Sequence, residues 1–332
     1  MAKRGRVYNR IYTDQKWSKV NSENKEIVDD YLAELKQRQK RDTTIAQYKN
    51  DLRIILIYIL EQKQNRSILE LNKKDFRGLS LWYSNQLDCS NARVNRILSS
   101  LRSMLAYVED DDDYDYDINA ASKVKGLPSE PVKTDDDLFF LTYEEVDEIR
   151  QMLLDGGNID LAALHMMLFD SGGRRTEVFQ AKKTDILDGN KTNIVDGKRG
   201  KKFPLVYLNE TKELIKEYLE WRGEDDIDSL WINIKGGVKT PVKSSQTLYN
   251  RVVKIAKMYS DLKGKEYLFF PHSYRHTRAE SMKQGTDPRL GYRKFSLEEI
   301  QLFLHHSDPK TTQGYLKDHS EEQIDAMFGF EE

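Results

Sequence analysis

The sequence predicts a mainly helical protein of two domains, with a small antiparallel sheet in the second domain. A chain of 332 residues is too long for one ordinary hydrophobic core. The first third repeats apolar residues at helical spacing in four stretches, which predicts an all-helical domain. The remainder mixes helical patterns with a short stretch around two glycines that is typical of a β-hairpin, which predicts a mixed α/β domain that is mostly helical.

The charge of the chain is unevenly distributed. Residues 1–108 hold 21 Lys and Arg residues against 12 Asp and Glu residues, whereas residues 109–137 hold 3 against 11. Basic segments favour polyanions, so the first third is a candidate for nucleic-acid contact. The single cysteine, Cys89, excludes an intrachain disulfide and a zinc cluster. We expect no metal site, no signal peptide and no membrane span, and therefore a cytoplasmic protein.

The start of the chain, residues 1–20, is a basic segment in which six cations alternate with Tyr8, Tyr12 and Trp17. Two interpretations stay open for it. It is either a partly disordered start or an arm that lies on phosphates while its rings stack or pack.

Four amphipathic helices are predicted in residues 21–108. Two of them begin near Asn21 and Thr43, and the others are expected at Lys73–Leu87 and Asn91–Val108. Their exposed faces are expected to carry cations. A solvated helix face explains any single one of these, but together they fit a phosphate-contacting surface better. The cations are Lys73, Lys74, Arg77, Arg93, Arg96 and Arg102.

An acidic linker is predicted to separate the two domains. Glu109–Asp117 places like charges on every helical turn, which disfavours a helix and predicts an exposed loop. Together with Pro128 and Pro131 it predicts an interdomain linker over residues 109–137, so the second domain is expected at residues 138–332.

The second domain is predicted to alternate helices with a small sheet. Thr142 and Glu145 form a predicted capping box that opens a helix ending near Leu154. A hairpin is predicted at Val195–Leu208, and Leu230–Ile232 is a candidate for a further strand. Other helices are predicted at residues 160–169, 245–259, 273–283, 297–304 and 321–327.

Two segments carry residues suited to binding one phosphate. Ser171–Val178 places two glycines before Arg174, whose guanidinium matches two phosphate oxygens, and Glu177 follows three residues later. Further on, His272 and Arg275 are spaced to lie on the same helix face, so both can reach one phosphate. Taken singly, the first segment is equally a surface ion pair at a helix start, and the second a structural His-x-x-Arg.

Two further segments complete the pattern. The predicted hairpin carries Lys198 and Lys201, and the stretch Leu304–Tyr315 places a tyrosine nine residues after His306. Alone, such a tyrosine is usually a packed ring, and a basic hairpin tip is an ordinary solubility feature. In one chain and in this order, the segments resemble the boxes of the tyrosine recombinases, the phage integrase family.

This resemblance implies a catalytic domain over residues 138–332 in which Tyr315 attacks a DNA phosphodiester. Arg174 and Arg275 would then clamp the non-bridging oxygens, and His306 would donate a further hydrogen bond. Glu177 would support the first arginine. The pattern around Thr43-Thr44-Ile45 and Asn95-Arg96-Ile97 is similar to the family's core-DNA-binding domain, which is helical and SAM-like and would occupy residues 21–108.

Proton transfer in the family requires a base and an acid. The resemblance assigns His272 as the group that takes the proton of the tyrosine. It assigns a hairpin lysine as the group that protonates the leaving 5′-oxygen. Lys198 is the preferred candidate because it directly follows Gly197, and Lys201 stays open as an alternative. The link through tyrosine conserves the energy of the phosphodiester, so no cofactor is expected.

The implied function is that of a site-specific DNA recombinase or integrase of a phage or other mobile element, which cleaves and rejoins DNA through a 3′-phosphotyrosyl intermediate. The expected partners are double-stranded DNA, other copies of the chain as a tetramer on paired sites, and accessory DNA-bending or directionality proteins in a prokaryotic cytoplasm. Two alternatives stay open: a catalytically silent DNA-binding regulator on the same scaffold, and a type IB topoisomerase.

The chain departs from the family pattern in three places. Gly173 stands where the family usually has a larger apolar residue, and His305 stands where it usually has a glycine. Residues 287–294 form an apparent insertion. After the tyrosine, residues 321–330 form a short amphipathic tail, which packs either on its own subunit or on a neighbour.

Overall fold

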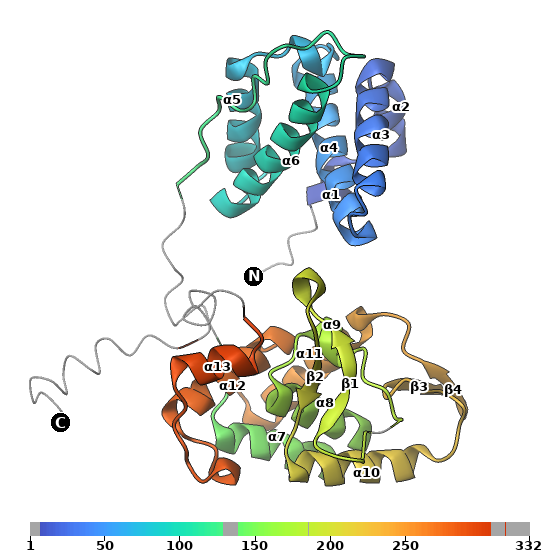
Figure 1. Cartoon of the computed structure of the whole chain (residues 1–332), viewed down its shortest axis with the longest axis vertical. Coiled ribbons are helices and arrows are strands. Elements are labelled where there is room, and N and C mark those ends of the chain that lie inside the picture. The colour runs from blue at the N-terminus through green and yellow to red at the C-terminus, as the bar shows by residue number, and fades with distance from the viewer. Residues whose placement is uncertain (1–6, 129–138, 185, 307–315, 317–332) are drawn as a thin grey trace, which may run out of the picture. The chain divides into compact units, whose positions relative to one another are not determined.

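The computed structural model describes residues 7–128, 139–184, 186–306 and 316. The chain divides into two compact units, Met1–Val132 and Lys133–Glu332, and this division falls within the predicted linker (Figure 1). The described residues are mostly helical and form two small antiparallel sheets, so the predicted fold class is confirmed. In the described part of the chain, no helix has both the length and the apolar character needed to cross a membrane.

The first unit consists of helices joined by loops in its described residues, and the four predicted helices are confirmed as α3, α4, α5 and α6. The third, predicted over Lys73–Leu87, is α-helical only as far as Leu81 and continues as a π-helical turn over Trp82–Gln86. The helices of this unit are α1 (Val7–Ile11), α2 (Asp14–Lys19), α3 (Ser22–Gln37), α4 (Asp42–Gln62), α5 (Lys73–Leu81) and α6 (Asn91–Glu109).

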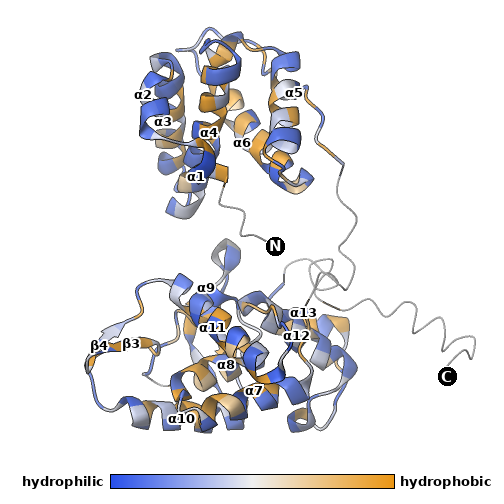
Figure 2. Cartoon of the chain, turned by 180° about the vertical axis from the view of Figure 1, so that it is seen from behind, coloured by the Kyte–Doolittle hydropathy of each residue, from blue (hydrophilic) through white to orange (hydrophobic). Residues whose placement is uncertain are grey.

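Helix α4 lies at the centre of this unit. Every residue from Ile54 to Ile59 is buried, because α1, α2, α3 and α6 all pack around it. Figure 2 shows the apolar residues of α4 and α6 toward the middle of this group and the polar residues toward its outside. The amphipathic patterns of the sequence thus meet in one core.

The start of the chain is ordered from Val7 onward. Helices α1 and α2 pack against the core, so the interpretation of a partly disordered start is wrong for residues 7–19, while residues 1–6 lie outside the described part. The Arg53 guanidinium lies 5.1 Å from the centre of the Tyr12 ring and 4.9 Å from that of Trp17. Cation–π contacts of this kind hold the segment onto α4.

Residues 109–128 also pack on the first unit, although they belong to the predicted linker over residues 109–137. The acidic side chains are mostly exposed, as predicted for this loop, but Tyr116 is buried in the core of the unit. Arg102 was expected on the exposed, phosphate-contacting face of its helix. Instead its guanidinium donates to the carbonyl oxygens of Ala121 and Val124, at 3.2 and 2.6 Å. The N–H groups of Arg102 therefore hold this loop on the first unit.

The second unit is organised around α8, in which every residue from Leu161 to Ser171 is buried. Its elements are α7 (Tyr143–Asp155), α8 (Ile159–Ser171), α9 (Arg175–Val178), β1 (Lys191–Asp196), β2 (Lys202–Val206), α10 (Asn209–Arg222), β3 (Ile232–Lys235), β4 (Val238–Pro241), α11 (Ser245–Lys263), α12 (Pro271–Gln284) and α13 (Leu297–Phe303). Helices α7, α10, α11 and α12 all contact α8.

Most predicted elements of this unit are confirmed. The capping box of Thr142 and Glu145 opens α7, and the predicted hairpin forms from β1 and β2, with Val195 opposite Phe203. The strand expected at residues 230–232 begins only at Ile232 and pairs with β4. Helix α10 was not predicted, and the helix predicted at residues 321–327 lies outside the described residues.

Replacing Arg102 with methionine should loosen residues 112–127. Loss of a buried donor costs about 1–3 kcal/mol, so amide hydrogen exchange in this loop should accelerate by roughly tenfold or more. Exchange measured by mass spectrometry on the full-length protein checks this. Arg77→Met, a change on the exposed face of α5, is the matched control. Equal exchange in both variants would contradict the anchoring role of Arg102.

Candidate active site

The end of α8 forms one wall of the candidate site. Gly172 terminates the helix in a left-handed conformation, with φ at +51°, which glycine adopts without strain. A Cβ atom on Gly173 would lie about 3 Å from the side chains of Ser171, Val178 and Leu205. The larger apolar residue usual in the family would therefore not fit here without movement of these neighbours.

Arg174 follows this turn and is fixed by Glu177. One carboxylate oxygen of Glu177 accepts from the Arg174 backbone N–H at 2.8 Å, and the other accepts from the guanidinium Nη1 at 2.9 Å. The Glu177 side chain is buried, whereas Arg174 is partly exposed. The bidentate arrangement orients the guanidinium and leaves donors available for a ligand.

Arg275 ties three segments together. It lies on α12, is only 2% exposed, and donates from Nη1 to the carbonyl oxygen of Gly172 at 2.6 Å. Its Nη2 donates to the carbonyl oxygen of Leu304 at 2.6 Å and lies 2.7 Å from Nε2 of His306. The ends of α8 and α13 thus meet at one guanidinium.

The contact with Arg275 determines the state of His306. Arginine is only a donor, so Nε2 of His306 must be the acceptor, and the neutral ring carries its proton on Nδ1. Burial, followed by the positive charges of Arg275, Arg174 and Lys201, lowers the pKa of His306 to about 3. The ring is therefore neutral at pH 7.

His272 stands one helical turn before Arg275. Partial desolvation, followed by the charges of His276, Arg275 and Arg174, lowers its pKa to about 4, although the side chain is solvent-exposed. The positive charges of the nearby arginines disfavour a second proton on the ring. His272 is then neutral at pH 7 and able to accept a proton.

The hairpin presents Lys201 rather than Lys198. Nζ of Lys201 donates to the carbonyl oxygen of His305 at 3.1 Å, beside His306, whereas Lys198 is exposed on the turn between the strands. The His305 ring stacks on Phe203 of β2 at 3.7 Å. His305 has φ at +54°, which explains why the family favours glycine at this position.

Most of the predicted catalytic residues meet at this place. Arg174, Glu177, His272, Arg275 and His306 come together. The predicted nucleophile, Tyr315, lies outside the described residues.

The predicted DNA-binding residues of the first unit have varied surroundings. Lys73, Lys74 and Arg77 are exposed on α5. Arg96 and Arg93 form ion pairs with the buried Asp51 at 2.9 and 3.6 Å, and both line a groove together with Gln47 and Asn50. Arg102, as described above, donates to backbone carbonyl oxygens of the following loop.

Sequence reasoning missed the groups that support the site. Phe203 and His305 stack across 102 positions, and the carbonyl groups of Gly172 and Leu304 hold Arg275. Backbone acceptors leave no trace in a sequence. The positive φ of His305 had one signal, namely its place where the family usually has glycine.

Replacing His306 with glutamine should weaken the pH dependence of stability. The folded-state pKa of His306 lies below its unfolded value, so the unfolded chain binds the proton first, and stability falls as the pH drops from about 6.5 toward about 3. A glutamine oxygen still accepts from Arg275 but does not titrate. Between pH 7 and pH 5, His306→Gln should therefore lose about 1–2 kcal/mol less unfolding free energy than the wild type. Urea denaturation at both pH values measures this, and equal losses would contradict it.

Comparison with known proteins places the chain in a family. The phage integrase family model matches residues 140–322, and the model of the phage integrase N-terminal SAM-like domain matches residues 28–111. The SPbeta prophage-derived recombinase-like protein YomM of Bacillus subtilis (strain 168) is 26% identical over 328 residues, which cover 94% of this chain and 92% of that protein.

Solved structures agree on the fold. XerH site-specific recombinase bound to a palindromic difH substrate matches with a TM-score of 0.65 at 19% identity, covering 95% of this chain and 91% of that chain. A lambda integrase tetramer bound to a Holliday junction matches with a TM-score of 0.65 at 17% identity, covering 89% and 77%. Because the first family model spans more than half of the sequence, the chain belongs to the phage integrase family and is a tyrosine recombinase.

Proposed function

We propose that this chain is the site-specific integrase of a phage or another mobile element, which cleaves and rejoins double-stranded DNA through a 3′-phosphotyrosyl intermediate. The observation that carries the proposal is the convergence of Arg174, Arg275, His306 and Lys201, from four separate segments, around one position. The prophage origin of the relative YomM supports the mobile-element part.

The chemistry follows from the charge of the phosphodiester. Its anionic oxygens repel a nucleophile until cations neutralise them. Arg174 and Arg275 supply two guanidinium groups, and neutral His306 donates through a ring N–H. Preorganised donors of this kind contribute strongly to catalysis, with one lost donor costing roughly 10²–10³ in rate.

The nucleophile and the proton transfers complete the step. The Oη of Tyr315 attacks the phosphorus in line, the bond from phosphorus to O5′ breaks, and a 3′-phosphotyrosyl link forms. His272, neutral at pH 7, accepts the phenol proton. We assign the proton donor for O5′ to Lys201, because its ammonium lies at the site and Lys198 is exposed on the turn. Attack by another 5′-hydroxyl reverses the step.

Assembly on DNA is part of the proposal. Lambda integrase is a tetramer in its complex with a Holliday junction, and XerH is bound to a palindromic substrate. We propose that this chain likewise works as a tetramer on paired sites in a prokaryotic cytoplasm, with accessory DNA-bending or directionality proteins. The exposed cations of α5 and the groove beside Asp51 would contact the duplex.

Tyr315→Phe should abolish covalent attachment to DNA. A duplex carrying the chain's binding site and a nick next to the scissile phosphate loses its leaving strand after cleavage, so the adduct accumulates and shows as a shifted band on a denaturing gel. Wild-type protein should form this adduct, and so should Tyr292→Phe, which alters an exposed tyrosine of the same unit.

Two outcomes of this experiment would reject the proposal. Specific binding without any adduct would assign the chain to the DNA-binding regulators. Relaxation of supercoiled plasmid that lacks any specific site would assign it to the type IB topoisomerases.

Lys201→Ala should slow cleavage by about 10²–10⁴-fold, because the leaving oxygen then lacks its proton donor. A substrate with sulfur in place of the bridging O5′ should restore the rate to within about tenfold, since a thiol has a pKa near ~8.5 and leaves without help. Lys198→Ala is the matched control and should behave like the wild type on both substrates. The reverse pattern would make Lys198 the proton donor.

A further inference from the structure

Beneath the site lies a cluster of four charged side chains that the mechanism does not use. Asp170, Arg278, Asp287 and Arg289 have side chains that are 0%, 4%, 2% and 8% exposed. Asp170 lies in the last turn of α8, Arg278 lies on α12, and the other two belong to the apparent insertion after α12. The end of α8 thus shares one buried ion network with α12 and the segment that follows it, and Arg289 lies 119 positions from Asp170.

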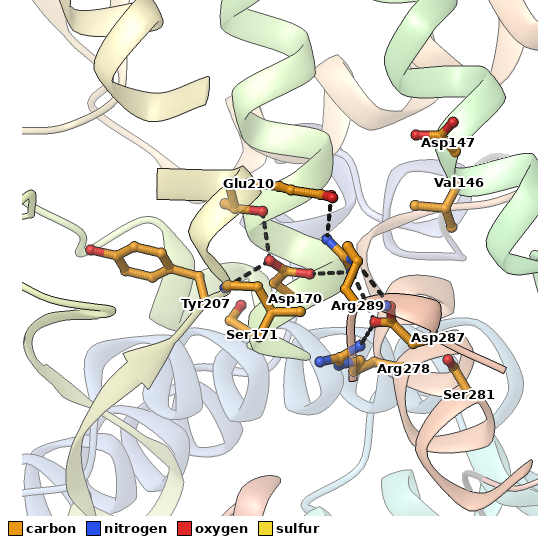
Figure 3. Close-up of polar contacts among 12 residues, drawn as sticks. Val146, Asp147, Asp170, Ser171, Tyr207, Glu210, Arg278, Ser281, Asp287 and Arg289 are labelled. Carbon is orange, nitrogen blue, oxygen red and sulfur yellow. Dashed lines mark hydrogen bonds and ion pairs between the residues drawn. The ribbon is translucent and has the colours of Figure 1, made fainter. Parts of the chain in front are cut away.

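Arg289 is the centre of this network. Its Nη2 donates to Asp170 at 2.7 Å and to Asp287 at 2.9 Å, and its Nε donates to Asp287 at 3.0 Å (Figure 3). Arg278 donates at 2.6 Å to Oδ2 of Asp287, the same oxygen that accepts from Nη2 of Arg289. The remaining oxygen of Asp170 accepts from the Leu208 N–H and from the Thr211 hydroxyl.

The network adjoins the residues that carry the phosphate chemistry. Asp170 stands two residues before Gly172, whose carbonyl oxygen binds Arg275, and four residues before Arg174. Arg278 follows Arg275 by one helical turn on α12. The network therefore connects the two elements that must hold both arginines at a constant separation.

Arg278 also contacts α13, the helix that leads to His306. The Arg278 guanidinium lies 5.2 Å from the centre of the Phe169 ring and 5.9 Å from that of Phe303. Phe303 ends α13 immediately before Leu304, whose carbonyl oxygen is the other acceptor of Arg275. Arg289 lies 5.5 Å from the same Phe169 ring. One aromatic ring thus contacts both cations of the network.

Stability alone does not account for such an arrangement. Burial of ion pairs costs about as much desolvation energy as their attraction returns, and hydrophobic replacements are often as stable. Burial alone would raise the pKa of Asp287, but the hydrogen bonds and charges of Arg289 and Arg278 lower it, so both partners stay ionised. The network does fix the relative positions of the elements that it joins, because a planar guanidinium donates hydrogen bonds only in defined directions.

We infer that Asp287 and Arg289, in the segment after α12, are positioning residues that hold the Arg174 turn and Arg275 in register for the phosphate. This inference rests on the proposed function. The segment then holds α8 and α12 at a fixed separation. Displacement of a catalytic group by about 1 Å costs on the order of 10²-fold in rate, so a small change in this separation is sufficient to be measured.

The test compares Arg289→Lys with Arg293→Lys in the full-length protein. Lysine keeps the positive charge but lacks the planar guanidinium that donates to both Asp170 and Asp287. Arg293 lies in the same segment, is exposed, and pairs with Glu299, so its change is the matched control. Adduct formation on the nicked duplex, with saturating protein, should slow by about 10–10²-fold in Arg289→Lys and remain unchanged in Arg293→Lys. The melting temperature and the DNA affinity are measured alongside.

A second substrate separates positioning from a general loss of structure. A methylphosphonate at the scissile position carries no charge, so its cleavage depends less on charge neutralisation by the two arginines. On it, the deficit of Arg289→Lys should shrink to less than about threefold. If Arg289→Lys does not fold, the paired change Asp170→Asn with Arg289→Gln, which keeps hydrogen-bonding groups and removes both charges, is measured in the same way.

The outcomes are distinct. Wild-type adduct formation with an unaffected Arg289→Lys overturns this inference and leaves the proposed function intact. Equal slowing on both substrates, or slowing that matches a loss of folded protein or of DNA affinity, also overturns it. Absence of the adduct in the wild type overturns the proposed function and the inference together.

Discussion

The second unit depends on the buried guanidinium of Arg275. It donates to carbonyl oxygens at the ends of α8 and α13, and to His306 just after α13, so one side chain of α12 is hydrogen-bonded to two other chain segments. A buried cation is costly unless its donors find acceptors, and here Nη1 and Nη2 contact two backbone carbonyl oxygens and a neutral histidine, none of which adds a counter-charge. These contacts consequently leave the positive charge of Arg275 uncompensated.

That positive charge also explains the histidines. His306 and His272 have lowered pKa values because they are desolvated beside arginines, and both are neutral at pH 7. A neutral ring donates a hydrogen bond from one nitrogen and accepts at the other, whereas a doubly protonated ring can only donate. The arginines therefore lower the pKa of their neighbours, and in the proposed mechanism they also bind the anion.

The departures from the family pattern have local physical reasons. Gly173 stands in a space too crowded for a larger residue, and His305 adopts a left-handed conformation while it stacks on Phe203. Stacking and the hydrogen bond from Lys201 offset the strain of that backbone. The apparent insertion brings Arg289 to Asp170, 119 positions away.

The sequence by itself determined the helices of the first unit, the hairpin, the capping box of α7 and the order of the motifs, because periodicity and spacing are properties of neighbouring residues. Helix α10 escaped prediction, since no side chain of its own caps it and Asp170 of α8 binds the Leu208 N–H instead. Only the tertiary structure decided that Lys201 faces the site and that Arg102 serves the fold. Those outcomes depend on acceptors distant in sequence, such as the His305 carbonyl, 104 positions from Lys201, and no local pattern records such partners.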